Sequence, residues 1–134
     1  MKRILIATSL LCAAAAATAA TGPFDQPYSI IENDTVRSAD PNVIGVIVNR
    51  VDEQNAMPGN RAVVPPGTHQ VTVDVPPRKG FHTATQHTFT LVTEPCTRYY
   101  LSAKLASQVT QQWDPIVRSK ERIGECETKF AKAR

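Results

Sequence analysis

The sequence predicts an all-β protein, a single antiparallel β-sandwich of about six or seven strands with one disulfide, preceded by a signal peptide. Short runs of β-branched and apolar residues recur along the chain between clusters of Pro, Gly and Asn. Several of these runs alternate apolar with polar residues, as strands with one buried face do. The sequence has no βαβ alternation and no internal repeat, so one sheet packed on another is the expected architecture.

The N-terminus has the pattern of a secretory signal peptide, which we place over residues 1–20. Lys2 and Arg3 provide the positive region, and an apolar run over residues 4–17 is followed by small residues. The run is too short to span a membrane, and such a peptide is removed on export. Cys12 lacks the flanking residues of a lipidation site, so we expect a periplasmic or secreted protein that is not lipidated.

Removal of the signal peptide leaves about 114 of the 134 residues, enough for one domain with one core. The full chain has 15 Lys and Arg against 12 Asp and Glu, so the loss of Lys2 and Arg3 leaves 13 against 12, a net charge of +1. The sequence has no basic block and no basic stripe interleaved with aromatic residues, so we expect no nucleic-acid partner. No second apolar segment has the length of a membrane span, and none is expected.

The exported chain divides into a lead-in, a domain and a tail. Residues 21–34 are rich in Pro and polar residues and are interpreted as the lead-in segment, while residues 35–126 form the β-sandwich domain. Residues 127–134 are charged and are interpreted as a frayed tail. Within the domain, the β-branched residues 43–48 predict a buried central strand, and residues 49–61 predict a polar loop.

The clearest strand follows the turn Pro65-Pro66-Gly67, because Pro presets φ and Gly tolerates positive φ. Apolar and polar residues alternate after this turn. The face predicted to be buried carries His69, Val71, Val73 and Val75. Pro76-Pro77 ends the strand because proline lacks a backbone donor.

Three more strands are predicted toward the C-terminus. Residues 83–92 alternate with Phe89 and Leu91 on one face, and residues 96–104 alternate with Tyr99, Leu101 and Ala103 on one face. A four-residue apolar spacing over residues 101–113 also fits a helix. We favour a strand to about residue 105, then a loop to residue 112, a stop at Pro115 and a last strand over residues 116–123.

Two cysteines remain after removal of the signal peptide, Cys96 and Cys126. An exported chain meets an oxidising compartment, in which two thiols usually pair. A bond between them would close a loop of 31 residues, counting both cysteines. Such a bond stabilises a domain by roughly 3–4 kcal/mol. CxxC spacing is absent, so the sequence predicts a structural disulfide rather than a redox pair or a nucleophile.

The stretch VVPPGTHQVTVDV, residues 63–75, resembles the core of PEGA-type and related transthyretin-like modules, in which a Pro-Gly turn introduces an alternating strand. Further downstream, Pro95-Cys96, Arg98-Tyr99-Tyr100, Trp113-Asp114-Pro115 and the stretch from Glu121 to Cys126 are similar to small uncharacterised periplasmic proteins of proteobacteria. These segments extend from about residue 43 to residue 126. The resemblance implies a β-sandwich of the export compartment and implies no catalytic residues.

Three histidines, His69, His82 and His87, are the candidate metal ligands, because imidazole binds Zn and Cu. Their spacing gives little support, since His82 and His87 would face opposite sides of one continuous strand. No carboxylate lies beside them at the spacing of a metal site. We expect no bound metal and no other cofactor.

The sequence offers no catalytic set. Its carboxylates fall mostly in predicted loops, and no Ser or Cys is marked as a nucleophile. A phosphate-binding loop, a dinucleotide fingerprint and an HExxH motif are all absent from the sequence. We therefore expect a protein that is not an enzyme.

The candidate recognition residues are Tyr100 and Trp113. Tyr99 and Tyr100 are adjacent on a strand, so one should be buried and the other exposed. An exposed tyrosine beside Trp113 would make a recognition patch, since Tyr and Trp are frequent in binding hot spots. The alternative is that Trp113 covers the open end of the sandwich over the disulfide.

Together, these patterns predict a non-catalytic exported module that binds an envelope protein or glycan, or supports a larger envelope assembly. One alternative is a secreted hydrolase inhibitor that presents the loop over residues 49–61. A second alternative is a periplasmic metal-binding protein that uses the three histidines.

Overall fold

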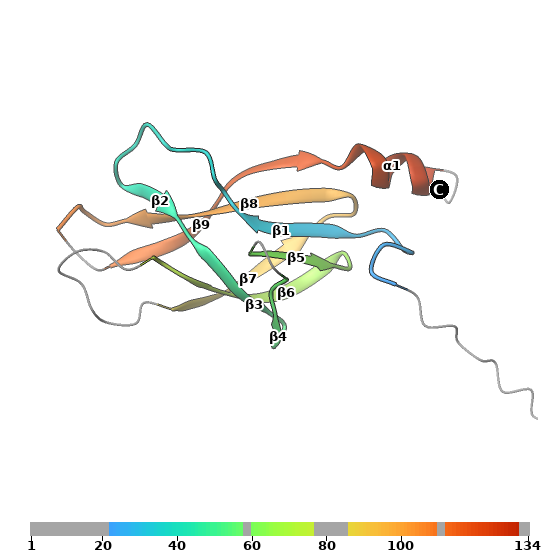
Figure 1. Cartoon of the computed structure of the whole chain (residues 1–134), viewed down its shortest axis with the longest axis horizontal. Helices are drawn as coiled ribbons and strands as arrows, with labels where there is room; N and C mark the ends of the chain where they lie inside the picture. Colours follow the sequence, from blue (N-terminus) through green and yellow to red (C-terminus); the bar gives the residue numbers. More distant parts are fainter. Residues whose placement is uncertain (1–21, 58–59, 77–85, 110–111, 132–134) are drawn as a thin grey trace, which may run out of the picture.

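The computed structural model describes residues 22–57, 60–76, 86–109 and 112–131. In these residues nine strands form two sheets, and one helix, α1 (Gly124–Phe130), follows the last strand (Figure 1). The all-β class predicted from the sequence is confirmed. At seven residues, α1 is far too short to cross a membrane, and the described chain has no other helix that could. The predicted signal peptide lies outside the described residues.

The first sheet, sheet A, is built around β8 (Thr97–Leu105). On one side β8 pairs with β9 (Trp113–Arg122), and on the other it pairs in succession with β1 (Ser29–Asn33) and β2 (Val43–Gly45). Strand β5 (Arg61–Val64) pairs with the free side of β1. The β1–β8 pairing is parallel, so sheet A departs from the purely antiparallel arrangement predicted from the sequence.

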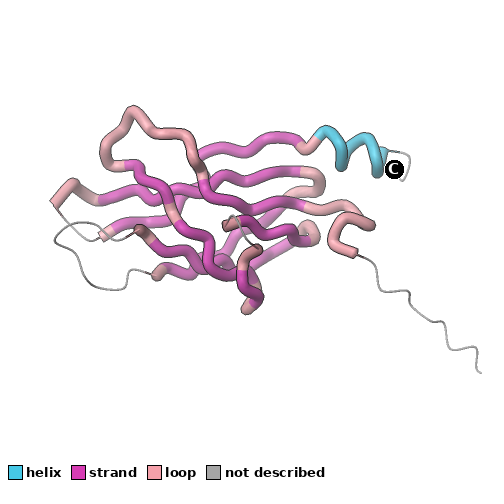
Figure 2. Tube along the Cα trace, viewed as in Figure 1, coloured by secondary structure: helices cyan, strands magenta, loops and turns pink. Residues whose placement is uncertain are grey.

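The second sheet, sheet B, is antiparallel throughout. It contains β3 (Ile47–Val51), β4 (Gln54–Asn55), β6 (Gly67–Asp74) and β7 (His87–Thr93), in the order β4-β3-β6-β7. Figure 2 shows the strands of both sheets running along the length of the molecule, with α1 at one end. The two sheets contribute to a single main hydrophobic core.

The alternating strands supply this core as the sequence predicts. On β6 and just beyond it, all four residues of the predicted inner face are buried, namely His69, Val71, Val73 and Val75. On β8 the buried face carries Tyr99, Leu101, Ala103 and Leu105. Each fully buried aliphatic side chain stabilises the fold by about 1.5–3 kcal/mol relative to exposure. The opposite face of each strand is left for surface functions.

The described strands alternate between the two sheets, and the chain changes sheet four times, between β2 and β3, β4 and β5, β5 and β6, and β7 and β8. Residues 43–48, predicted as one central strand, are split at buried Val46 into β2 of sheet A and β3 of sheet B. Pro65-Pro66 separates β5 of sheet A from β6 of sheet B. This turn was expected, and Gly67 after it has a φ of 137°, which favours glycine.

Residues 49–55, in the first half of the predicted loop 49–61, form strands and a tight turn instead, and residues 58–59 lie outside the described residues. Strand β3 continues to Val51, and Asp52 and Glu53 turn the chain directly into β4 with φ values of 49° and 68°. Positive φ at both central residues defines a type I′ hairpin turn, whose twist matches that of the strands. The prediction of a long protruding loop is wrong because the polar residues here belong to a tight hairpin.

The limits of the domain also differ from the expected ones. Strand β1 lies inside residues 21–34, the expected lead-in, and is an interior strand of sheet A. Helix α1 includes residues 127–130 of the expected frayed tail. It packs beside β1 in a second apolar cluster that includes Tyr28, Ile30 and Ile123. Both ends of the described chain are therefore part of the fold.

The described residues of 101–113, namely 101–109 and 112–113, are not helical. Strand β8 continues to Leu105, as favoured from the sequence, and β9 begins at Trp113. Pro115 was expected to end an element, but it lies within β9 opposite Ala103. The proline is accommodated because β9 pairs only with β8, and an edge strand has no second ladder that needs its missing donor.

Candidate functional site

A groove of about 470 Å³ lies between sheet A and the segment 34–42, which connects β1 to β2. The segment forms one wall, β2 another, and Ser102 of β8 and Arg118 of β9 also line the groove. The segment arches over β2 and β8 at the end of the molecule away from α1 (Figure 1). This volume falls within the range of small-ligand sites, about 300–1,000 Å³.

Arg118 reaches the groove because of a β-bulge. Tyr100 of β8 pairs with Ser119 and Leu101 pairs with Val117, so Arg118 is the extra residue on β9. A bulge bends its strand and redirects the side chain of the extra residue. The guanidinium donates from Nη1 to Oδ2 of Asp34 at 2.8 Å and to the carbonyl oxygen of Val36. Arg118 thereby joins β9 to the segment 34–42.

The carboxylate of Asp34 is fully partnered at the base of the groove. Its side chain is only 7% exposed, and a charge so buried requires an ion pair and hydrogen bonds. Oδ2 accepts from Arg118, and Oδ1 accepts from the backbone N–H of Val36 at 2.8 Å. The backbone N–H of Asp34 donates to the carbonyl of Leu101 at 2.9 Å. These contacts fix the first end of the segment on sheet A.

The second end of the segment is fixed through Asp40. Lys104 of β8 donates to Oδ2 of Asp40, and Oδ1 accepts from the backbone N–H of Asn42 at 2.9 Å. These two hydrogen bonds, first that from Lys104, lower the pKa of Asp40. The backbone N–H of Leu105 donates to the carbonyl of Asn42 at 2.7 Å. The segment is therefore anchored to β8 at both ends.

Between the two anchors, Val36 and Arg37 face outward. The Val36 side chain is 69% exposed, and Arg37 is exposed with no ion pair to any described residue. Ile44 of β2 lines the groove nearby. An arginine that is free to bind, held beside apolar side chains, suits a ligand that carries an anionic group on an apolar body.

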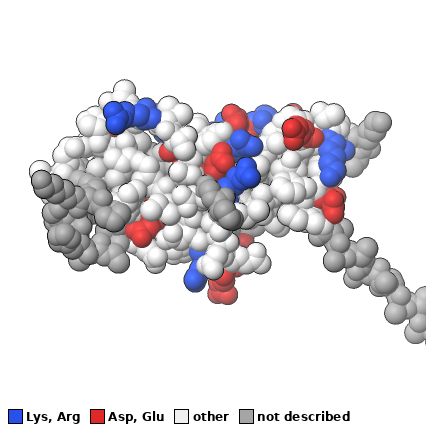
Figure 3. Space-filling view, viewed as in Figure 1, with Lys and Arg blue, Asp and Glu red and all other residues white. Residues whose placement is uncertain are grey.

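The surface between the groove and α1 is charged with both signs. Arg98 lies 3.7 Å from Glu32 and 3.8 Å from Glu121, and the Tyr100 hydroxyl donates to Glu121 at 2.8 Å. Figure 3 shows acidic and basic side chains interspersed over the middle of the molecule. These pairs neutralise one another, whereas Arg37 beside the groove has no ion-pair partner among the described residues.

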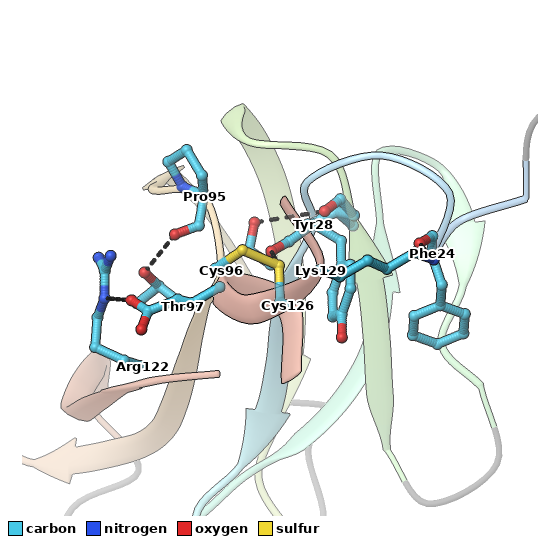
Figure 4. The surroundings of a disulfide bond; sticks show 11 residues. Phe24, Tyr28, Pro95, Cys96, Thr97, Arg122, Cys126 and Lys129 are labelled. Carbon is cyan, nitrogen blue, oxygen red and sulfur yellow. Dashed lines mark hydrogen bonds and ion pairs between the residues drawn. A yellow bond between two sulfur atoms is a disulfide. The ribbon is translucent and has the colours of Figure 1, made fainter. Parts of the chain in front are cut away.

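The predicted disulfide between Cys96 and Cys126 is present, with 5.3 Å between the two Cα atoms. Cys96 directly precedes β8, and Cys126 lies in α1. The bond lies beside Tyr28, whose carbonyl accepts from the N–H of Cys96 at 2.8 Å (Figure 4). Both cysteines are buried and bonded, so neither provides a thiol for chemistry.

Tyr100 and Trp113 do not form a common recognition patch. Trp113 is 4% exposed in the main core, with its ring centroid 4.3 Å from that of His87. Tyr100 is half-buried on the other face of sheet A. The alternative position, over the disulfide, is also wrong, because Trp113 pairs with Leu105 at the opposite end of the β8–β9 ladder.

His69 is buried in a network of its own. Nδ1 contacts the carboxylate of Asp52, and Nε2 lies 2.6 Å from the carbonyl oxygen of Pro65. Both ring nitrogens of His69 are therefore engaged, one by a side chain and one by the backbone. The hydrogen bond from His69, followed by that from the Gln70 N–H, lowers the pKa of Asp52.

The candidate metal ligands are not brought together. On the β6–β7 ladder His69 pairs with Leu91, whereas His87 pairs with Val73. That places the two histidines roughly 13 Å apart along the strands. His82 lies outside the described residues, and the described ones contain no group of three or more His, Cys, Asp or Glu that could hold a metal.

No family model matches the chain, and no curated protein or solved structure matches it. The resemblance to PEGA-type and transthyretin-like modules stays a prediction.

Proposed function

We propose that the protein is a non-catalytic binding module of the cell envelope, periplasmic or secreted, and that the groove beside the segment 34–42 is its recognition surface. The ion pair between Asp34 and Arg118 is the observation that supports this most. It links a bulged strand to the segment and holds the groove in one shape. A preordered surface loses less conformational entropy on binding than a flexible one does.

The side chains of the groove favour binding over catalysis. Asp34 and Asp40 are both engaged by basic side chains, Arg118 and Lys104 respectively. A carboxylate engaged in such an ion pair positions other groups and is poorly placed to exchange a proton with a substrate. Serving as an anchor is therefore the role that fits both carboxylates.

The ligand class follows from the outward side chains. Arg37 provides a cation that has no ion-pair partner in the part of the chain that the structure describes, and Val36 with Ile44 provides apolar contact. We expect the partner to be an envelope protein with an acidic, partly apolar segment. A glycan would need hydroxyl contacts more than the apolar wall, so an acidic oligosaccharide is the competing ligand in the test.

A photocrosslinking side chain at position 36 tests this proposal in envelope extracts. The same probe at Thr128, exposed on α1 away from the groove, is the control. We expect a protein adduct specific to position 36, which Arg37→Glu abolishes and Arg37→Lys retains. Identical adducts from the two positions, or an adduct indifferent to Arg37→Glu, would contradict the proposal. If an acidic oligosaccharide alone competes with the probe at position 36, the partner is a glycan rather than a protein.

The two alternative functions have less support. The inhibitor was based on a protruding loop at residues 49–61, which contain a tight hairpin and short strands instead. The metal-binding protein was based on converging histidines, and His69 is engaged by Asp52 and Pro65.

A further inference from the structure

Strand β7 is the last strand of sheet B in the described chain, and it is unlike the other sheet edges. It pairs with β6 on one side, and no other strand follows it in the sheet. A free edge exposes a row of backbone donors and acceptors that another strand can pair with. Natural edges are usually short, charged, bulged or interrupted by proline.

The other edge strands of the described chain have such protection. Strands β2, β4 and β5 contain only three, two and four residues, respectively. Strand β9 is long, but Pro115 interrupts it and the bulge at Arg118 bends it. It also carries a dense set of charged side chains, namely Asp114, Arg118, Lys120, Glu121 and Arg122.

Strand β7 has none of these features. Its seven residues, HTFTLVT, include no proline and no Lys, Arg, Asp or Glu, and their register with β6 is continuous. Its solvent-facing side chains are Thr88, Thr90 and Val92, and Val92 is 65% exposed. Thr, Phe and Val all favour extended strands. The edge of β7 therefore has no bulge, no proline and no Lys, Arg, Asp or Glu side chain that would prevent another strand from pairing with it.

We infer that β7 pairs with β7 of a second copy of this chain, antiparallel and centred on Thr90, so that the two copies of sheet B become one continuous sheet. A symmetric antiparallel pair places the same patch of both copies together. In this register Thr90 lies opposite Thr90, and Thr88 lies opposite Val92. No like charges meet, and Gln86 lies opposite Glu94 beyond the strand ends.

Self-pairing fits this edge better than pairing with a charged foreign strand. Cross-strand Thr–Thr pairs and Thr–Val contacts are favourable on an exposed sheet face, whereas like charges directly opposite are destabilising. The exported chain has a net charge of only +1, with 13 basic against 12 acidic residues, so repulsion between copies is weak. A single pair of seven-residue strands is a small interface, and the dimer should be weak and concentration-dependent.

Sedimentation velocity of the exported chain over a wide concentration range tests the pairing. We expect reversible dimerisation of the wild type. Thr90→Lys and Thr90→Glu should each sediment as monomers where the wild type dimerises, since each places two like charges opposite one another. An equimolar mixture of the two variants should associate at least about fivefold more tightly than either variant alone.

The matched control is Gln70→Lys. Gln70 lies opposite Thr90 on β6, one strand inward on the same face, and its Nε2 donates to the Thr90 hydroxyl at 2.9 Å. The control loses the same hydrogen bond and adds the same charge away from the edge, so it should dimerise like the wild type. Circular dichroism melts confirm that each variant is folded.

A wild type that stays monomeric would overturn the inference. So would a dimer that survives Thr90→Lys, a mixture that fails to associate, or a Gln70→Lys variant as monomeric as Thr90→Lys. An envelope protein strand found paired with β7 in place of a second copy would also overturn it.

Discussion

His69 of β6 contacts the carboxylate of Asp52 through Nδ1, and its other ring nitrogen faces the carbonyl of Pro65 at 2.6 Å. The histidine thus connects the β3–β4 hairpin turn to the turn that joins β5 to β6. It does so from a core position, with only 6% of its surface exposed. An imidazole on the inner face of a strand is here a structural link between two turns.

Replacement of His69 by Ala should therefore destabilise the fold. It removes two hydrogen bonds and leaves a cavity in the core. We expect the free energy of unfolding to fall by about 2–4 kcal/mol. Urea unfolding measures this, with Thr68→Ala at the exposed neighbouring position as the control. Equal effects of the two substitutions would show that the His69 contacts contribute nothing.

The Asp52 contact predicts a pH dependence. The pKa of Asp52 is held below its usual value of 3.8, first by the hydrogen bond from His69 and then by the Gln70 N–H. A carboxyl with a lowered folded-state pKa stabilises the fold above its unfolded pKa, and the effect is lost as the pH falls through the folded pKa. The difference in Tm between wild type and Asp52→Asn should thus be present at pH 7 and shrink below about pH 4. Asp52 is half-exposed, so solvent screening keeps the difference small. A difference that stays constant from pH 7 to pH 2 would contradict this.

The disulfide predicts a large loss of stability on reduction. It joins residues separated by 30 positions, and such a loop closure stabilises by roughly 3–4 kcal/mol. The double variant Cys96→Ser/Cys126→Ser should melt more than about 10 °C below the wild type, since each 1 kcal/mol shifts a domain of this size by about 4 °C. Alkylation without reduction should leave Cys96 and Cys126 unmodified in the mass spectrum. Two modified thiols would contradict the bond.

Substitution of Arg118 should destabilise the fold through Asp34. Arg118→Met keeps the aliphatic stem and leaves a 7%-exposed carboxylate without its cation. We expect a loss of about 2–4 kcal/mol, less than for a fully buried pair because Arg118 is 27% exposed. Adding Asp34→Asn should recover part of the loss, as measured by urea unfolding of both single variants and the double variant. Purely additive effects would show that the two residues are not coupled.

The position of Trp113 predicts its fluorescence. It is the single tryptophan of the chain and is 4% exposed. Emission of the folded protein should be blue-shifted and resistant to iodide quenching, and it should shift to the red on unfolding. Red-shifted, readily quenched emission from the folded protein would place Trp113 on the surface.

The strands with clear alternation could be predicted from the sequence, whereas their assignment to sheets could not. Residues 67–74 and 97–105 each have one buried face, which a period of two reveals directly. The break at Val46 was missed because residues 43–48 are apolar throughout apart from Gly45, so no change of period marks the change of sheet. Strand β1 was missed because it is only five residues long and pairs with β8, far along the chain.

The groove was missed for a related reason. The segment 34–42 contains Asp, Ser and Pro, which are typical of turns. The partner of Asp34 is 84 residues away and is redirected by a bulge, which no local pattern in the sequence indicates. The pairing of distant strands, rather than any local pattern, brings these residues together into a site.

The parallel pairing of β1 with β8 constrains the order in which the chain can fold. Ile31 can pair with Tyr99 only after most of the chain has been synthesised, and β2 depends on the same strand. A fragment that ends before residue 97 has just β5 beside β1 and nothing beside β2, although it contains every described strand of sheet B. Sheet A is therefore completed last, because its central strand comes from the carboxyl-terminal third of the chain.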